Sequence, residues 1–180
     1  AKQIVKISQK NRNDHVLRRL RGQLNKNTAT IYEVCSNDED VTVLEEYISG
    51  ATLRHIVEAN GGTLKRELAV KYALDICNGL VFIHSLGIIH RDIKPSNIII
   101  TEQGEAVIID FGIARLTDDS KYADTKNLGT AGYAAPEQFG FRQTDVRTDV
   151  YAVGVLLNQM LTGMLPQEQL TDGSLRKVIR

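Results

Sequence analysis

The sequence predicts an α+β fold in which short strands come first and long helices follow. Runs rich in β-branched residues at 3–7, 28–34 and 41–44 predict strands in the first quarter of the chain. Stretches with apolar residues at helical spacing, at 64–86 and 148–162, predict helices in the remainder. A chain of 180 residues has the size of one domain and can bury a sizeable core.

Capping signals set the expected helix boundaries. We expect a helix over residues 14–24, whose apolar positions fall at helical spacing, and a short helix over residues 52–60. For the two long helices, the expected N-caps are Thr63 and Thr148, and the glycines expected just beyond their ends are Gly87 and Gly163.

Composition excludes several classes of protein. The apolar share of 42% and the charged share of 24% are ordinary for a soluble domain, and the formal net charge of zero draws the chain to neither nucleic acid nor an acidic membrane. There is no signal peptide and no run of 18 apolar residues, so we expect no membrane contact from this segment. Cys35 and Cys77 are expected to be reduced thiols, which predicts a cytoplasmic location.

The stretch from residue 84 to residue 112 carries the chemistry. Isoleucine-rich and valine-rich runs at 98–100 and 106–109 flank a polar turn and predict a β-hairpin. A tight hairpin brings its two ends together, so Asn97 and Asp110 become neighbours, with Asp92 close by.

These residue types suit phosphoryl transfer. Asn97 and Asp110 offer oxygen ligands for Mg²⁺, a hard cation that takes few protein ligands. Asp92 can orient a hydroxyl group and accept its proton, and Lys94 can place positive charge on the transferring phosphoryl group.

The same residues resemble the signature of protein kinases. The motifs are His-Arg-Asp at 90–92, Asn97, Asp-Phe-Gly at 110–112 and Ala-Pro-Glu at 135–137. The chain therefore resembles a Hanks-type protein kinase. Lys94 is the choice typical of serine/threonine kinases, and the compact loops and the Pro-Ser-Asn run at 95–97 resemble bacterial members. The resemblance implies ATP and Mg²⁺ as cofactors and a protein serine or threonine as the acceptor.

The resemblance also implies a kinase-like two-lobe fold and a nucleotide site between the lobes. Residues 1–48 would form part of the small β lobe, and residues 49–180 the mainly helical large lobe with the catalytic loop, the activation segment and the F helix. Nucleotide contacts are expected from the Lys6 side chain, from backbone groups of the hinge and from one strand residue; the hinge and strand residues are Glu46, Ile48 and Ile99.

The chain departs from the family pattern in two places. The helix expected at residues 14–24 contains no glutamate to pair with Lys6, so either another group, such as the Glu45 carboxylate, pairs with this lysine or the ion pair is missing. No G-x-G-x-x-G loop occurs, and kinase domains are longer than this chain, so we expect an excerpt of one.

Two hypotheses follow from these departures. The first is an active kinase whose glycine-rich loop precedes Ala1. The second is a pseudokinase that acts as a nucleotide-binding or scaffolding module. The five intact chemical residues favour the first, since a scaffold has no physical need for all of them: Lys6, Asp92, Lys94, Asn97 and Asp110.

The segment from residue 110 to residue 137 is long, polar and rich in hydroxyl groups, as activation segments are. The hydroxyl candidates for phosphorylation or for a contact with the catalytic loop are Thr117, Ser120, Tyr122, Thr125 and Thr130. The resemblance favours Thr125 for phosphorylation, in trans within a homodimer, and Thr130 for the contact with Asp92 and Lys94.

The resemblance assigns three further supporting residues. Arg91 would bind an activation-loop phosphate. Asp149 would accept hydrogen bonds from the catalytic-loop backbone. Glu137 would lack the arginine that usually pairs with it, because the family's last helices are missing from this chain.

Overall fold

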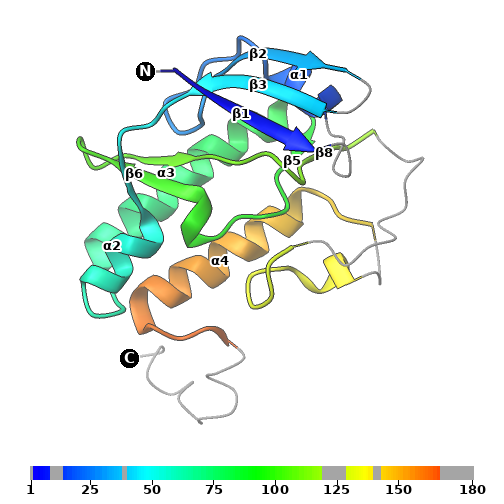
Figure 1. Cartoon of the computed structure of the whole chain (residues 1–180). Helices are drawn as coiled ribbons and strands as arrows, with labels where there is room; N and C mark the ends of the chain where they lie inside the picture. The colour runs from blue at the N-terminus through cyan, green and yellow to red at the C-terminus, as the bar shows by residue number, and fades with distance from the viewer. Residues whose placement is uncertain (1, 9–13, 38–39, 119–128, 140–142, 167–180) are drawn as a thin grey trace.

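The computed structural model describes residues 2–8, by their backbone alone, and residues 14–37, 40–118, 129–139 and 143–166. Helices and small antiparallel sheets alternate along the chain, which confirms the predicted α+β class. Figure 1 shows a small sheet and one short helix at the top and the other helices below them.

The small sheet has the order β1-β3-β2 and is antiparallel throughout. Its strands are β1 (Lys2–Ser8), β2 (Ile31–Ser36) and β3 (Asp40–Glu46). They confirm the three predicted strands, with β2 shifted a few residues toward the C-terminus. Lys6 lies opposite Thr42, as expected for a residue of β1; its side chain lies outside the described part of the chain.

Helix α1 (Asp14–Leu20) packs on this sheet through Val16, Leu17 and Leu20, all buried. The prediction of a helix as far as residue 24 was wrong. Gly22 has a φ of 76°, which an α-helix does not allow, so the chain leaves the helix and Leu24 is 76% exposed.

The lower part contains α2 (Leu53–Ala59), α3 (Arg66–Ser85) and α4 (Val146–Thr162), and α3 packs along α4 (Figure 1). Both predicted N-caps of the long helices were wrong. Near Thr63, the Leu64 amide donates to Met160 O (2.7 Å), which delays the start of α3 until Arg66.

At the other long helix, Asp145 is the N-cap and accepts from the Arg147 amide, so α4 begins before Thr148. A side-chain hydrogen bond from Arg147 lowers the pKa of Asp145, so this cap is charged at neutral pH. The predicted ends hold: Gly87 follows α3, and Gly163 closes α4 in the left-handed region.

Two further sheets position the stretch from residue 84 to residue 112, which the sequence predicts to carry the chemistry. One has the order β4-β6-β7, made of Gly50–Thr52, Ile98–Thr101 and Ala106–Ile108. The other pairs β5 (Ile88–Ile89) with β8 (Arg115–Leu116). Short 3-10 helices occupy Pro95–Asn97 and Pro136–Phe139. The predicted hairpin is confirmed, with Ile98 opposite Ile108.

One hydrophobic core runs from the small sheet to α4. It holds α3 directly against β7, and its fully buried residues include Ile76, Ile83, Ile98, Ile108 and Leu156. Both cysteines are free, in line with the expectation of reduced thiols. Among the described residues, no helix combines the length and apolarity needed to cross a membrane.

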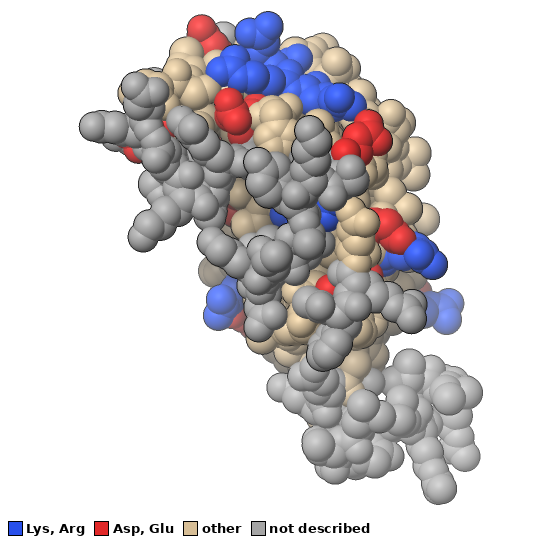
Figure 2. All heavy atoms as spheres, turned by 90° about the vertical axis from the view of Figure 1, so that its right-hand side faces the viewer, with Lys and Arg blue, Asp and Glu red and all other residues tan. Residues whose placement is uncertain are grey.

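The surface carries charges of both signs. Figure 2 shows Lys and Arg atoms gathered at the upper end of one face, around the small sheet and α1, and mixed with acidic atoms lower down. This distribution agrees with a formal net charge of zero.

Replacing a glycine inside a helix by alanine usually stabilises a protein. At Gly79, where α3 lies close against β7, we expect the opposite effect. A Cβ on Gly79 would lie 2.7 Å from Asn27 O and 2.9 Å from Ile108 Cδ1, whereas a Cβ on Gly154 in α4 would meet nothing within 4 Å. We expect Gly79→Ala to lower the free energy of unfolding by about 1–3 kcal/mol, and Gly154→Ala to raise it by about 0.5–1 kcal/mol. Urea denaturation of the two variants measures both; stabilisation by Gly79→Ala would contradict the packing.

Candidate active site

A buried carboxylate on α4 holds the catalytic loop in place. Asp149 is fully buried, and its two oxygens accept the backbone amides of His90 (2.9 Å) and Arg91 (2.8 Å). The same carboxylate lies 2.8 Å from His84 Nε2. The prediction that Asp149 bonds the backbone of the loop is confirmed. His84 was missed, because nothing in its sequence context marks a histidine at the end of α3 as a partner.

The loop conformation that Asp149 supports is an unusual one. Arg91 has a φ of 66°, in the left-handed region that side chains other than glycine seldom adopt. Its carbonyl accepts from Gln138 Nε2 (2.8 Å), and its guanidinium donates twice to Ile113 O (2.8 and 2.6 Å). Gln138 is a second residue that sequence reasoning missed, because it lies 47 positions along the chain.

His90 is completely buried inside this loop. Its Nε2 lies 3.2 Å from Ile109 O, and its ring packs against Phe111 with the ring centroids 5.2 Å apart. These contacts connect the His-Arg-Asp loop to the Asp-Phe-Gly segment and give His90 a packing role.

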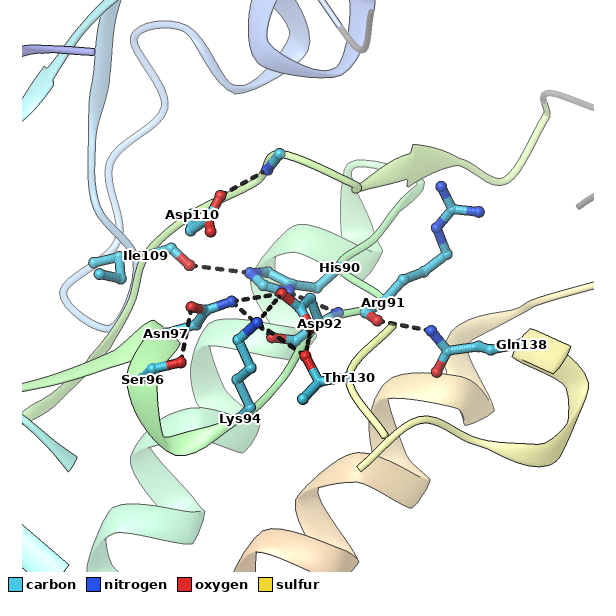
Figure 3. Close-up of polar contacts among 11 residues, drawn as sticks. His90, Arg91, Asp92, Lys94, Ser96, Asn97, Ile109, Asp110, Thr130 and Gln138 are labelled. Atoms are coloured by element: carbon cyan, nitrogen blue, oxygen red, sulfur yellow. Dashed lines mark hydrogen bonds and ion pairs between the residues drawn. The ribbon is translucent and has the colours of Figure 1, made fainter. Parts of the chain in front are cut away.

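Asp92 is the centre of a compact polar network (Figure 3). Its Oδ1 accepts from Thr130 Oγ1 (2.8 Å), and its Oδ2 accepts from Asn97 Nδ2 (2.9 Å) and pairs with Lys94 Nζ (2.7 Å). Lys94 Nζ also donates to Thr130 Oγ1 (2.9 Å). Both charged side chains are mostly buried, so solvent screens the pair less than it would at the surface.

The hairpin joins the two predicted metal ligands as expected. The Ile109 amide donates to Asn97 O (3.0 Å), which places Asp110 directly beyond the end of the strand pair. Asp110 is exposed, has a φ of 63°, and turns its Oδ1 back to the Gly112 amide (3.0 Å). Asn97 donates through Nδ2, and its amide oxygen accepts one long hydrogen bond from Ser96 Oγ (3.4 Å), which leaves a second lone pair of that oxygen for a cation.

The residues present fit a magnesium ion. The donors on offer are the amide oxygen of Asn97 and the exposed carboxylate of Asp110, and Mg²⁺ commonly takes one or two protein ligands and keeps several waters. Within the described residues, no cluster of three or more His, Cys, Asp or Glu side chains offers an alternative metal site.

The predicted nucleotide contacts are only partly brought together. Ile99 lies on β6 with its Cγ2 3.0 Å from the position of a Cβ on Gly50, so it faces the segment after Ile48. The Glu46 amide already donates to Thr30 O (2.8 Å). Glu46 and Ile48 line a cavity of about 430 Å³ whose other walls include Lys26, Glu105 and Val107 but neither Ile99 nor Asp110.

The activation segment is described at its two ends. Thr130 contacts Asp92 and Lys94, whereas Thr125 lies outside the described residues. Glu137, which was expected to lack its usual arginine partner, is half-buried and accepts a hydrogen bond from Thr148 Oγ1 (2.8 Å).

A second cavity, of about 390 Å³, opens beside the network. The catalytic loop forms one wall, through Lys94, Pro95 and Ser96. The facing walls come from α2, the end of the activation segment and α4, with side chains Arg54, Val57, Glu58, Thr130, Tyr133 and Gln159.

Comparison with known proteins gives the same class as the fold and the site. The protein kinase domain family matches residues 1–180, so the chain belongs to that family. The chain is 37% identical over 174 residues to the probable serine/threonine-protein kinase CPE1738 of Clostridium perfringens, covering 92% of this chain and 25% of that protein.

Other relatives carry the name PknB. The probable serine/threonine-protein kinase PknB of Bifidobacterium longum is 45% identical over 127 residues, which cover 69% of this chain and 18% of the relative. The serine/threonine-protein kinase PknB of Mycolicibacterium smegmatis is 42% identical over 127 residues, covering 69% and 20%. The chain thus spans about a quarter or less of the curated relatives it matches.

The Asp149 contacts predict a large loss of stability from a single substitution. Asp149→Ala leaves the buried amides of His90 and Arg91 unpaired, so we expect the free energy of unfolding to fall by about 3–5 kcal/mol. The exposed N-cap of the same helix is the control, since Asp145→Ala should cost about 1 kcal/mol. Equal losses for the two variants in denaturant titrations would contradict the supporting role of Asp149.

Proposed function

We propose that this chain is the catalytic part of a serine/threonine protein kinase, which transfers the γ-phosphoryl group of ATP to a serine or threonine hydroxyl of a protein. The observation that carries the proposal is the network in which Asp92 meets Lys94, Asn97 and Thr130 within 3 Å. Membership of the protein kinase domain family and the names of the relatives support it.

Asp92 has the role of orienting the acceptor and taking its proton. Its Oδ1 already accepts a hydrogen bond from one threonine hydroxyl, that of Thr130, which supports its ability to hold another in the same way. Lys94 lies against the same carboxylate and can neutralise charge on the phosphoryl group as the new bond forms. Asn97 fixes the second oxygen of Asp92, so the carboxylate presents one orientation.

Asn97 and Asp110 would hold Mg²⁺ through their side-chain oxygens. The bound ion supplies neutralisation of the phosphate charges. Lys6 and the backbone of Glu46 and Ile48 would bind ATP, with Ile99 beneath its base.

The cavity beside Lys94 is suited to an acceptor segment of a protein. It touches Lys94 and Thr130 of the network and extends across to Arg54 and Glu58 on α2. The salt bridge between Arg54 and Glu58 (2.9 Å) leaves little net charge on that wall, so we expect no strong preference for a charged residue there.

Three finer assignments belong to the same proposal. The kinase acts in the cytoplasm on protein substrates, and it phosphorylates Thr125 in trans as a homodimer. Arg91 receives the resulting phosphate on the activation segment. The pseudokinase alternative rests on the absence of glutamate from residues 14–24, and the assembled network around Asp92 weighs against it.

Substitutions of two aspartates should affect phosphate transfer and nucleotide binding separately. We expect Asp92→Asn to lower the rate of label transfer from Mg-ATP to a generic basic protein by about 10²–10⁴-fold, with nucleotide affinity nearly unchanged. Asp110→Asn should weaken nucleotide binding by about 10–100-fold in the presence of Mg²⁺ and little in its absence. Calorimetric titration with and without Mg²⁺ measures affinity. Full transfer activity in Asp92→Asn would show that the assigned base is wrong.

A third variant tests the bridging hydroxyl. Thr130→Val removes the hydrogen bonds to both Asp92 and Lys94, so we expect kcat to fall by about tenfold or more. Thr130→Ser keeps the hydroxyl and is the matched control, which should retain most of the activity. Steady-state kinetics with a serine peptide compares the two, and equal kcat values for the valine and serine variants would contradict a bridging role.

A further inference from the structure

A threonine hydroxyl and an arginine guanidinium from distant parts of the chain flank Gly87. From the position of a Cβ on Gly87, Thr117 Oγ1 lies 3.2 Å away and Arg19 Nη1 lies 3.6 Å away. The Thr117 amide donates to Gly87 O (2.8 Å), and Arg19 Nη1 donates to Leu86 O (3.2 Å). Both groups therefore lie beside the turn at the end of α3 and within 3.6 Å of one common point.

The side chains of Thr117 and Arg19 can both make further hydrogen bonds. Thr117 and Arg19 are exposed, and across the described part of the chain the Thr117 hydroxyl makes no hydrogen bond, while Arg19 makes the single one to Leu86. A guanidinium carries five N–H donors, so several remain for another acceptor. The upper end of the face in Figure 2 is rich in basic atoms around α1, and Asp118 adds one exposed, screened negative charge.

A phosphate on Thr117 would complete this arrangement. It adds about −1.5 to −2 charge and three strong acceptor oxygens, which extend beyond Oγ1 toward the arginine. Arginine binds phosphate with paired, charge-assisted hydrogen bonds. Removal of the hydroxyl hydrogen breaks no existing hydrogen bond among the described residues, and the one acidic neighbour named above, Asp118, is exposed.

We propose that Thr117 is a phosphorylation site and that its phosphate binds Arg19, tying the start of the activation segment to α1. The donor is Mg-ATP in the active site of a second copy, so the inference rests on the proposed function. The γ-phosphorus–oxygen bond to ADP breaks, a bond forms from phosphorus to Thr117 Oγ1, and the hydroxyl proton passes to Asp92 of the second copy. Strand β8 pairs over two residues only, so Thr117 can detach at low cost to reach that site.

The proposed contact between the Thr117 phosphate and Arg19 would stabilise the position of α1. This helix is seven residues long, and the predicted helical segment 14–24 contains no glutamate that could anchor it to Lys6. The phosphate supplies an anchor from the other end of the helix, through Arg19. Phosphorylated protein should therefore expose the α1 amides less often.

The experiment uses two forms of the 180-residue chain. The Asp92→Asn chain, whose own transfer rate should be lower by about 10²–10⁴-fold, is the acceptor, and the unmodified chain with Mg-ATP is the enzyme. Fragmentation mass spectrometry of the acceptor should place phosphate on Thr117. Hydrogen exchange of residues 14–20 should slow by about tenfold on phosphorylation. This slowing should persist in Arg18→Gln, whose arginine bonds Ser36 instead, and disappear in Arg19→Gln.

The outcomes separate this inference from the proposed function. Phosphate on a generic substrate or elsewhere on the acceptor, with none on Thr117, would overturn the inference and leave the kinase proposal standing. If Thr117 is phosphorylated but hydrogen exchange of residues 14–20 slows equally in the Arg19→Gln chain and in the parent, the proposed contact between the phosphate and Arg19 would be wrong. Labelling of neither the acceptor nor a generic substrate would contradict the kinase proposal, and the inference would fall with it.

Discussion

The site depends on one buried carboxylate. Asp149 on α4 accepts two consecutive backbone amides of the catalytic loop and contacts His84 at the end of α3, so three separate elements meet at one side chain. A fully buried charge is costly unless donors surround it, and here they do. The helix is itself anchored in the core by Leu156 and Met160, which transmits the rigidity of the core to the loop.

The contacts around the site stabilise backbone conformations in its loops that are unfavourable on their own. Among the described residues, the two with positive φ that are not glycine are Arg91 and Asp110, and each adjoins a residue of the network or is a proposed ligand. Such conformations cost on the order of 1 kcal/mol or more and persist where surrounding contacts enforce them. Gln138 and Asp149 do so at Arg91, and the Gly112 amide does so at Asp110. The strain is thus concentrated where the chemistry is proposed.

Local sequence patterns made much of the fold, and part of the candidate site, predictable. The hairpin, the small sheet and the closeness of Asn97 to Asp110 followed from alternation and turn residues, because these signals are local. The misplaced boundaries have non-local causes: Leu64 bonds to Met160 ahead of α3, and Thr148 turns to Glu137 while Asp145 caps α4. His84 and Gln138 were missed for the same reason, since their partners lie 65 and 47 positions away.

The most direct measurement is phosphate transfer from labelled Mg-ATP to three peptides that differ only in the acceptor: serine, threonine or tyrosine. The account predicts label on the serine and threonine peptides and little on the tyrosine peptide, because Asp92 already accepts a hydrogen bond from a short aliphatic hydroxyl, that of Thr130. Tight Mg-ATP binding without transfer to any peptide, or transfer to tyrosine alone, would contradict it.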